Sequence, residues 1–450
     1  MNETVLIHLS GSNQPGLTAV LTAILANYHA CVLDIGQAVV HETLVLGLLI
    51  EIPPDNFPHL QNALVKKSGE LNLQVSFKPV SKSDLEHWIY SQGKDRFIIT
   101  ILGRAISANH LARVSAIIEE HGLNVDRIER LSGRRSLAVH TSTTNACVEL
   151  RASGNATSEA SMRADFLATA HELRIDIAFQ RESIFRRNRR LFAFDMDSTL
   201  IQGEVIDELA KMAGVADKVV AITESAMRGE IEFQESFRRR VELLRGLSEQ
   251  SVHELLGTIP LVEGAEQLIG TLKMLGYKTA ILSGGFTFFA RHLQQRLGVD
   301  YVFANELDIV DGKVSGQVKT EIVDGPRKAE LLRQIARKEN ISLEQVIAVG
   351  DGANDLPMLG IAGMGIAFRA KPIVRQTAGH AVSFLGLDSL LYLIGVRDRD
   401  FDEFLSASVI ESSTNESLLP LFRASALRTV GGLQGALAPG LSPAQMRRKS

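Results

Sequence analysis

Two carboxylates follow a short apolar segment near the middle of the chain. The segment covers residues 191–194 (Leu-Phe-Ala-Phe), and Asp195 and Asp197 come directly after it. A short apolar run is typical of a buried strand, and open α/β sheets bind ligands beyond the carboxyl ends of their strands. Like charges so close together need a shared proton or a cation, and oxygen ligands suit a hard divalent ion such as Mg²⁺. The pair therefore predicts a metal site.

A third acidic group follows a second apolar segment. Residues 346–349 (Val-Ile-Ala-Val) lead into residues 350–355 (Gly-Asp-Gly-Ala-Asn-Asp), in which glycines allow the backbone to approach a ligand closely. Because the carboxyl ends of parallel strands meet at one edge of a sheet, Asp351 is expected to lie near the first two carboxylates. We expect it to complete the metal site.

A hydroxyl and an ammonium group complement these acids. Residues 281–285 (Ile-Leu-Ser-Gly-Gly) offer the hydroxyl of Ser283 and the flexible backbone amide of Gly284 after another apolar run, a combination suited to phosphate oxygens. Lys328 supplies the positive charge that a phosphate dianion requires, although its neighbour Arg327 competes for that role.

Taken in order, these four groups resemble the motifs of the haloacid dehalogenase superfamily of phosphotransferases. Each motif alone is weak, because an Asp-rich loop is commonly only a turn or a helix cap. Four matches in the family's order are specific. The resemblance implies a doubly wound parallel sheet with a helical cap, and transfer of a phosphoryl group to an aspartate.

The resemblance also implies a role for each residue. Asp195 would attack phosphorus to form an aspartyl-phosphate, and Asp197 would protonate the leaving oxygen and then activate water. Mg²⁺ would be held by the Asp195 side chain, the Asp197 backbone carbonyl and Asp351. Asn354 would help to position the substrate, and Asp355 would support the metal shell. The remaining phosphate oxygens would be bound by Ser283, the Gly284 amide and Lys328.

Within this superfamily, residues 190–395 resemble the phosphoserine phosphatase family. The segments that carry the resemblance are residues 195–200 leading to Glu204, 226–233, 238–241 and 365–372. They imply Mg²⁺-dependent hydrolysis of O-phospho-L-serine to L-serine and phosphate, the last step of serine biosynthesis. An alternative within the same class is another small phosphate, such as phosphohomoserine or a sugar phosphate.

Specificity for serine requires recognition of an ammonium and a carboxylate group together. Glu204 suits the ammonium, and the planar fork of Arg240 suits the carboxylate. Each has an ordinary alternative: Glu204 as an acid at a helix N-terminus, and Arg240 as surface charge beside two other arginines. Met227 and Phe233 line the cap above the substrate in the resemblance, although apolar residues at this spacing are also common in a core.

The elements that must position these groups follow from the hydrophobic pattern. From residue 191 onward, strands at 191–194, 277–282, 301–303 and 346–349 alternate with helical segments, which predicts the doubly wound parallel sheet. Residues from about 204 to 258 read as mostly helical, and we expect them to form the cap over the strand ends. The phosphatase domain is expected at residues 185–397.

Before this domain, the order strand, helix, strand, strand, helix, strand occurs twice, over residues 1–82 and 95–184. The first set has strands at 4–10, 31–40, 43–52 and 73–79, with helices opening after 13–16 and at 57–68. The second set has strands at 96–103, 124–131, 136–141 and 175–180, with helices at 107–122 and 158–173. Two ferredoxin-like domains in tandem are predicted.

The first of these domains resembles an ACT domain, a family of small-molecule sensing modules, through residues 13–17 (Asn-Gln-Pro-Gly-Leu) and 34–37 (Asp-Ile-Gly-Gln). The resemblance implies an amino-acid effector such as serine near residues 13–16. The corresponding loop of the second domain, residues 103–107, lacks the Pro-Gly pair. Alternatively these domains mediate homodimerisation through sheet edges, or the chain is chiefly an amino-acid sensor with a vestigial phosphatase.

Composition excludes several other classes of protein. Lys plus Arg number 48 and Asp plus Glu 52, so no strong field attracts nucleic acid or an anionic membrane. No apolar run approaches the length that spans a bilayer, and the amino terminus lacks the basic region of a secretion signal. The only cysteines, Cys31 and Cys147, make no disulfide framework, which favours a reducing cytoplasm.

Two segments are assigned no chemistry. The basic cluster at residues 185–190 (Phe-Arg-Arg-Asn-Arg-Arg) lacks a surrounding aromatic and basic stripe, so we interpret it as a solvated junction and not a phosphate or nucleic-acid patch. Residues 398–450 lose the regular pattern of the preceding domain and are expected to form an irregular extension.

Overall fold

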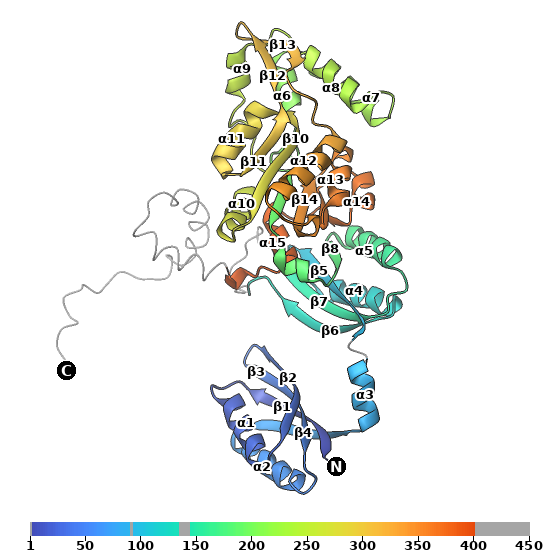
Figure 1. The fold of residues 1–450 in the computed structure, drawn as a ribbon, viewed down its shortest axis with the longest axis vertical. Helices are drawn as coiled ribbons and strands as arrows, with labels where there is room; N and C mark the ends of the chain where they lie inside the picture. Colours follow the sequence, from blue (N-terminus) through green and yellow to red (C-terminus); the bar gives the residue numbers. More distant parts are fainter. Residues whose placement is uncertain (1, 91–92, 135–144, 401–450) are drawn as a thin grey trace, which may run out of the picture. The chain divides into compact units, whose positions relative to one another are not determined.

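The computed structural model describes residues 2–90, 93–134 and 145–400 (Figure 1). The chain divides into two compact units, Met1–Lys94 and Asp95–Ser450. Among the described residues, no helix is long and apolar enough to cross a membrane. The extension expected at residues 398–450 lies outside the description from residue 401 onward.

The first unit is a four-stranded antiparallel sheet with two helices. Its elements are β1 (Glu3–Ser12), α1 (Leu17–Asn27), β2 (Cys31–Val40), β3 (Thr43–Ile52), α2 (Phe57–Glu70), β4 (Leu73–Val80) and α3 (Lys82–Tyr90). The strand order β2-β3-β1-β4 is that of a ferredoxin-like domain, as predicted. Alternate residues of β1 are buried because successive side chains of a strand point to opposite faces, and only one face meets α1 and α2.

The second unit begins with a second domain of the same topology. Its elements are β5 (Asp95–Gly103), α4 (Ala108–Glu120), β6 (Leu123–Arg130), β7 (Ala146–Gly154), α5 (Glu159–Leu173) and β8 (Asp176–Arg181), in the sheet order β6-β7-β5-β8. The third strand was expected at residues 136–141, and the strand that pairs with β6 and β5 in the described part of the chain is β7. Residues 136–141 themselves lie outside the described residues.

The position of β7 was missed because its pattern does not alternate. Val148 and Leu150 pack on the helices of their own domain, whereas Cys147 on the opposite face belongs to the core of the following domain. A strand that is covered on both faces reads as a continuous apolar run. Burial of the whole strand therefore removes the period of two on which the prediction relied.

A six-stranded parallel sheet follows. Its strands are β9 (Leu191–Phe194), β10 (Lys278–Phe286), β11 (Tyr301–Asn305), β14 (Val346–Gly350), β15 (Met364–Phe368) and β16 (His380–Val382), in the order β11-β10-β9-β14-β15-β16. The helices that connect them are α10 (Ala265–Met274), α11 (Thr287–Leu297), α12 (Gly325–Lys338), α13 (Leu356–Ile361) and α14 (Pro372–Thr377), and α15 (Leu390–Leu393) follows the last strand.

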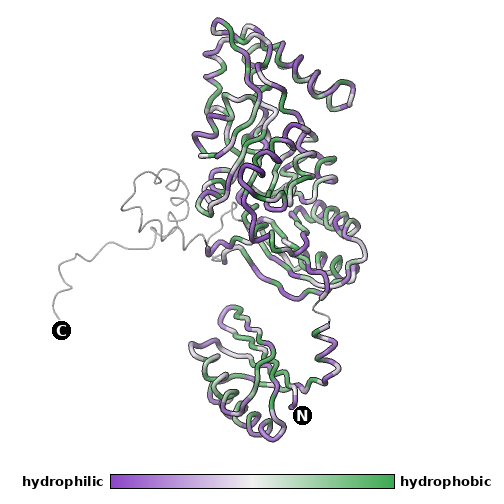
Figure 2. The backbone as a smooth tube through the Cα atoms, in the orientation of Figure 1, coloured by the Kyte–Doolittle hydropathy of each residue, from purple (hydrophilic) through white to green (hydrophobic). Residues whose placement is uncertain are grey.

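This sheet confirms the predicted doubly wound architecture. Its central strands are strongly hydrophobic (Figure 2), and alternate residues of β9 and β14 enter two separate cores on opposite faces of the sheet. The chain builds outward from β9 in both directions, so the order of the strands reverses there. A reversal of this kind opens a crevice at the carboxyl ends of the strands, which is the usual ligand site of such sheets.

A helical cap separates β9 from α10, as predicted. It contains α6 (Val205–Met212), α7 (Ala216–Met227), α8 (Phe233–Glu242) and α9 (Glu249–Glu254). A hairpin that the sequence analysis missed, β12 (Leu307–Val310) and β13 (Lys313–Val318), completes it. The Gly246 amide donates to the Val314 carbonyl at 2.8 Å, and the Glu249 amide donates to Gly312 at 2.9 Å. The Asp311-Gly312 turn was the available signal for this hairpin.

The basic cluster at residues 185–190 is not simply a solvated junction, and this part of the sequence analysis is corrected. Arg186 and Arg189 are buried. Arg186 pairs with Glu149 of β7 at 2.5 Å, and Arg189 donates to the carbonyls of Glu344 and Gly363. A guanidinium group has five donors in a fixed fork and can therefore satisfy buried carbonyl groups at the ends of neighbouring elements.

Candidate active site

The acidic groups meet at the carboxyl edge of the parallel sheet. Strands β9 and β14 are hydrogen-bonded neighbours in which Phe194 pairs with Val349, so the residues that follow each strand leave the sheet side by side. The Asp195 amide donates to the Val349 carbonyl at 2.9 Å. Oxygen atoms of Asp195, Asp351 and Asp355 lie within 4.8 Å of one another. The structure thus brings Asp195 and Asp351 together with Asp355, whereas the carboxylate of Asp197, the other member of the expected pair, is not part of this group.

Lys328 lies within this carboxylate group. Its Nζ atom is 2.8 Å from Asp195 Oδ1 and 2.7 Å from Asp355 Oδ1, and its side chain is fully buried. Burial alone lowers the pKa of a lysine, but Asp195 and then Asp355 outweigh it and raise the pKa of Lys328 above its ordinary value. Arg327 points elsewhere and pairs with Glu330 at 2.8 Å. The cation of this site is therefore Lys328.

The helix that carries Lys328 begins at the same edge of the sheet. Asp324 is the N-cap of α12, and its Oδ1 accepts the amide of Arg327 at 3.0 Å. Its other oxygen, Oδ2, accepts from Gln234 Nε2 of the cap at 2.7 Å. The start of the lysine helix is thereby fixed both by its own cap residue and by α8.

Two buried acids, Asp195 and Asp355, and the half-buried Asp351 face one ammonium group, so the site carries excess negative charge. Burial, followed by repulsion from Asp355, raises the pKa of Asp195 well above its usual range and that of Asp351 to about 7. A bound divalent cation would offset this charge. The three carboxylate groups place oxygen atoms close enough together to bind one ion. Carboxylate oxygens are the ligands that Mg²⁺ prefers, so these residues fit that ion.

Asp197 is oriented away from the other carboxylates and toward the cap. Its Oδ1 accepts the amide of Val205, the first residue of α6, at 2.9 Å. Burial raises the pKa of Asp197 to about 7. A side chain at position 285 would collide with Asp197 Oδ2, so Gly285 leaves the space that this carboxyl group occupies. A group of this kind, beside a second carboxylate, is suited to carry a proton.

The carboxyl-terminal part of β10 presents a hydroxyl and two amides. Ser283 is fully buried, and its Oγ accepts the Gly285 amide at 2.9 Å. A Cβ atom at Gly284 would lie 4.0 Å from Asn354 Nδ2, which places that amide group over the same segment. The predicted phosphate-binding residues therefore lie together beside Lys328 and the carboxylates.

Asn305 holds this segment in place, and the sequence analysis missed it. The residue is fully buried at the end of β11. Its Nδ2 donates to the Gly284 carbonyl at 2.7 Å, and its Oδ1 accepts the Val323 amide at 2.9 Å, one residue before the cap of the lysine helix. Its place at the end of a parallel strand was the signal that could have identified it.

Asp355 and Thr199 complete the packing around the acids. Asp355 Oδ2 accepts the Gly352 amide at 2.9 Å while its Oδ1 meets Lys328, so both oxygens are engaged. A side chain at position 350 would collide with Asp355, which explains the glycine there. Thr199 Oγ1, a contact not anticipated, donates to Asp351 Oδ1 at 3.3 Å.

The cap contributes the two groups expected to recognise an amino acid. Arg240 of α8 is buried, with Nη1 3.9 Å from Glu204 Oε2 and 3.5 Å from Thr223 Oγ1. Its Nε is buried and has no partner among the described residues. Its neighbour Arg239 is exposed and pairs with Glu235 at 2.7 Å, so only Arg240 faces inward.

The two apolar cap residues differ in position. Phe233 is half-buried, with its ring stacked on that of Phe237 and 3.4 Å from where a Gly284 Cβ would lie. Met227 is 59% exposed, and its sulfur lies 3.9 Å from Lys371 Nζ. Phe233 thus covers the phosphate-binding segment, whereas Met227 lies at the rim of the cap.

Three segments match known family models. Residues 189–363 match the haloacid dehalogenase-like hydrolases. Residues 3–78 and 96–180 each match an ACT domain. Both resemblances found in the sequence are therefore confirmed.

Curated relatives match along most of the chain. It is 41% identical over 393 residues to the phosphoserine phosphatase of Streptomyces coelicolor, covering 87% of this chain and 92% of that protein. It is 37% identical over 402 residues to phosphoserine phosphatase SerB2 of Mycobacterium tuberculosis, covering 87% and 93% respectively.

Two solved structures are also similar. A haloacid dehalogenase family hydrolase from Salmonella enterica serovar Typhi matches with a TM-score of 0.57 at 30% identity, over 67% of this chain and 98% of that one. The unliganded probable phosphoserine phosphatase of Vibrio cholerae matches with a TM-score of 0.52 at 31% identity, over 68% and 88%.

Proposed function

The chain belongs to the phosphoserine phosphatase family, and on that premise we propose how its own residues hydrolyse O-phospho-L-serine to L-serine and phosphate. The reaction is the last step of serine biosynthesis and passes through an aspartyl-phosphate. The observation that carries the proposal is the position of Lys328, whose Nζ lies 2.8 Å from Asp195 Oδ1. Asn305 ties Val323, just before the helix of Lys328, to Gly284, the neighbour of Ser283. A phosphate bound among Asp195, Lys328 and Ser283 would meet a nucleophile, a cation and hydrogen-bond donors at once.

Asp195 is the nucleophile. Its carboxylate lies at the switch point of the sheet, where the Met196 amide donates to its Oδ1 at 2.8 Å and Lys328 contacts the same oxygen. These two donors fix the side chain, which leaves Oδ2 to attack phosphorus. A P–O bond to Asp195 forms as the bond from phosphorus to the serine oxygen breaks, so one difficult displacement becomes two easier ones.

Asp197 is the general acid and then the general base. Its protonated form gives a proton to the departing serine oxygen, and the resulting carboxylate takes a proton from the water that attacks the aspartyl-phosphate. The Val205 amide fixes Oδ1, so Oδ2, which lies beside Gly285, is the oxygen that carries the proton.

The phosphoryl oxygens are bound by the core of the domain. The Ser283 hydroxyl, the Gly284 amide and Lys328 provide donors on one side, and Asn354 reaches over the same segment. Asp195, Asp351 and the backbone carbonyl of Asp197 would hold Mg²⁺, with Asp355 supporting them. When bound, the ion neutralises negative charge on the phosphoryl group as it transfers.

The amino-acid part of the substrate is bound by the cap. Arg240 binds the carboxylate and Glu204 binds the ammonium group. In the structure these two side chains contact each other only at 3.9 Å, and the substrate groups would take the place of that contact. The buried Nε of Arg240, which has no partner among the described residues, is a donor that the substrate carboxylate would satisfy.

The experiment is phosphate release from phosphoserine, phosphohomoserine, sugar phosphates and an aryl phosphate, each with Mg²⁺ and with a chelator. We expect selective, chelator-sensitive hydrolysis of phosphoserine. A flat profile would indicate a general small-molecule phosphatase, and equal rates with chelator would refute the metal site. Silence across the panel would favour a sensor with a vestigial catalytic domain.

The first ACT domain binds an amino acid such as L-serine and joins two chains into a homodimer. The loop at residues 13–16 ends at Gly16, whose φ of 86° starts α1. Strand β2 lies at a sheet edge and is exposed along its whole length, including Ile35 and Val40. An unpaired apolar edge is suited to pair with a second copy. Sedimentation of the full chain with and without L-serine tests both points.

The protein works in the cytoplasm. Cys31 is exposed and Cys147 is buried, and both are free thiols. An exposed free thiol is stable in a reducing compartment and is a liability outside it. Fractionation of cells that produce the protein would test this location, and recovery in a secreted fraction would refute it.

A further inference from the structure

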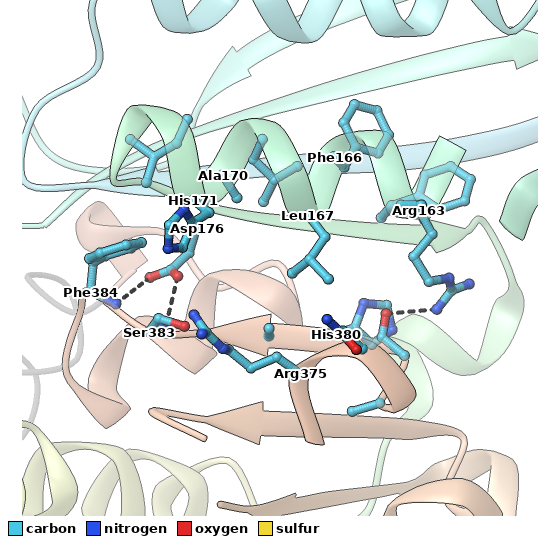
Figure 3. A pocket seen from close by; sticks show the side chains of 18 of the residues that line it. Arg163, Phe166, Leu167, Ala170, His171, Asp176, Arg375, His380, Ser383 and Phe384 are labelled. Carbon is cyan, nitrogen blue, oxygen red and sulfur yellow. Dashed lines mark hydrogen bonds between the residues drawn. The ribbon is translucent and has the colours of Figure 1, made fainter. Parts of the chain in front are cut away.

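A cavity separate from the candidate active site lies between the second ACT domain and the edge of the phosphatase sheet (Figure 3). Its volume is about 190 Å³, which leaves room for several groups of the size of water. One wall is α5 with the start of β8, and the other runs from the end of α14 through β16 to Phe384. None of the residues proposed for catalysis lines this cavity.

The two walls are tied together on both sides of the cavity. Asp176 accepts the amides of Ser383 at 2.6 Å and Phe384 at 3.0 Å, and Arg163 Nη1 donates to the Gly379 carbonyl at 2.6 Å (Figure 3). These hydrogen bonds join the two walls and fix the spacing between them. The space is a built feature of the joint between the domains and not a gap between loosely placed parts.

The charged groups of the cavity favour an anion. Arg163 uses one of its five donors on Gly379, and within the described part of the chain Arg375 makes no ion pair. Asp176 is the one acid among the lining residues, and backbone amides already engage both of its oxygens. Within the described ranges, the lining of the cavity therefore offers guanidinium donors that make no hydrogen bond and no carboxylate oxygen that lacks one.

His380 adds a polar atom that lacks a partner. Its Nδ1 is buried and accepts or donates no hydrogen bond among the described residues. Burial, followed by repulsion from Arg163 and Arg189, lowers the pKa of His380 to about 3, so the ring is neutral. An unsatisfied buried polar atom is costly, and a ligand atom in the cavity would relieve that cost.

The rest of the lining is apolar, and small residues create the space. Ala160 and Ala164 lie one turn apart on the face of α5 that borders the cavity, while Leu167, Ile177 and Phe384 supply hydrocarbon surface. From this combination of free guanidinium donors, an unpartnered imidazole nitrogen and apolar walls, we propose that the cavity binds a small organic carboxylate with an apolar body.

This site differs from the effector loop proposed for the first ACT domain. In the second domain Arg104 of the equivalent loop pairs with Glu263 of the phosphatase part at 2.7 Å. The cavity also lies close in sequence to the catalytic edge. Helix α14 begins directly after Lys371, whose amide donates to the Asp351 carbonyl at 3.4 Å. A ligand that holds Arg375 would therefore restrain the segment that contacts the proposed metal ligand.

The test is calorimetric titration of the full-length protein with isovalerate, with L-leucine, with the uncharged isovaleramide and with inorganic phosphate. We expect a carboxylate to bind with a Kd of about 1 mM or tighter and isovaleramide to bind at least about tenfold more weakly. Binding of phosphate as tight as that of isovalerate would reduce the site to an unspecific anion site and overturn the proposal. The two carboxylate probes distinguish a simple acid from an amino acid.

Two variants locate the binding. Arg375→Ala removes the unpaired guanidinium and Ala164→Phe fills the cavity, and each should weaken isovalerate about tenfold or more. Arg337→Ala on the exposed face of α12 is the matched control and should bind as the parent protein does. No heat with either carboxylate, or unchanged affinity in Arg375→Ala, would refute the site. Because the measurement uses no phosphoserine, its outcome is independent of the proposed catalytic activity.

Discussion

Two buried charge clusters in the second unit differ in how their charges are balanced. In the catalytic cluster, three acids, Asp195, Asp351 and Asp355, face one ammonium group. In the joint cluster, Glu149 of the second ACT domain meets Arg186 at 2.5 Å, and Arg151 contacts its other oxygen at 3.2 Å. Arg151 also pairs with Glu182 at 3.7 Å, so two acids face two guanidinium groups. Arg186 also donates to the Leu393 carbonyl at 3.4 Å.

The difference separates the two purposes of a buried charge. A balanced and hydrogen-bonded pair such as Glu149 and Arg186 can persist in the folded protein alone, and it fastens one domain to another. In an unbalanced cluster of acids, mutual repulsion raises the pKa of the carboxyl groups. Such a cluster lacks positive charge, which a metal ion or a substrate would provide. Excess charge therefore marks the catalytic cluster, and balance marks the joint.

The largest expected effect is on catalysis. Asp195→Asn should lower turnover of phosphoserine by roughly a thousandfold or more, because an amide does not attack phosphorus. The same change should not lower the melting temperature, since it removes one charge from an overcharged cluster. Turnover and thermal unfolding measure the two effects, with the exposed Asp311→Asn as a control. Near-normal turnover would refute the nucleophile.

A change in the joint cluster should lower stability and leave turnover nearly unchanged. Arg186→Ala leaves Glu149 buried without its main partner and should lower the free energy of unfolding by about 3–5 kcal/mol, with little change in kcat. Chemical denaturation measures the loss, and the exposed neighbour Arg187→Ala should leave stability unchanged. A loss as small as that of the control, or a fall in kcat of a hundredfold, would contradict the distinction between the clusters.

Arg240 is a buried cation whose missing partner is the substrate. Arg240→Ala should raise the KM for phosphoserine roughly tenfold to a hundredfold while leaving the KM for an aryl phosphate nearly unchanged, because only phosphoserine has the carboxylate. Arg239→Ala, one residue away and exposed, is the control. An equal rise for both substrates would remove Arg240 from the specificity site.

Asn305 tests whether neutral groups also position the catalytic cluster. Asn305→Ala frees the Gly284 carbonyl and the Val323 amide and should lower kcat for both phosphoserine and an aryl phosphate about tenfold. Asn305→Asp retains the acceptor for Val323 and should recover part of the loss. The ratio of kcat values for the two substrates distinguishes this role from that of Arg240, and a change confined to phosphoserine would refute it.

The smallest effect concerns pH and the joint. Burial raises the pKa of Asp176 from 3.8 to about 6, although the backbone amides of Phe384 and Ser383 oppose the rise. The folded state therefore binds the proton of the Asp176 carboxyl group more tightly than the unfolded state does. The contribution of this proton to the free energy of unfolding is complete below pH 3.8 and is lost as the pH rises through about 6. Asp176→Asn should flatten that part of the stability profile. Denaturation at several pH values measures the slope, and an unchanged slope would refute the assignment.

The sequence predicted that Asp195 and Asp351 meet at one edge of the sheet because its signals are local. Each acid or hydroxyl directly follows a short apolar strand, and parallel strands bring their carboxyl ends together, so the meeting of Asp195 and Asp351 follows from topology. The choice between Lys328 and Arg327 remained open, since both lie in the first turn of one helix. Only the structure shows which of them faces inward.

The failures occurred where burial depends on a distant part of the chain. Strand β7 loses its alternation because the phosphatase core covers its outer face. Arginine is usually found at the surface, and Arg186 is buried because it pairs with Glu149, which is far away in sequence. Asn305 lies at the end of a parallel strand, but its contacts to Gly284 of β10 and to Val323 cannot be read from that position. No local pattern contains these long-range contacts.

In the proposed reaction the phosphoryl group passes through a covalent bond to Asp195. Acid quenching of the protein during turnover of phosphoserine, followed by peptide mass spectrometry, tests this step. We expect one added phosphoryl group on the peptide that contains residues 191–199, located at Asp195 and absent from Asp195→Asn. Turnover with no covalent phosphate, or with phosphate on another residue, would contradict it.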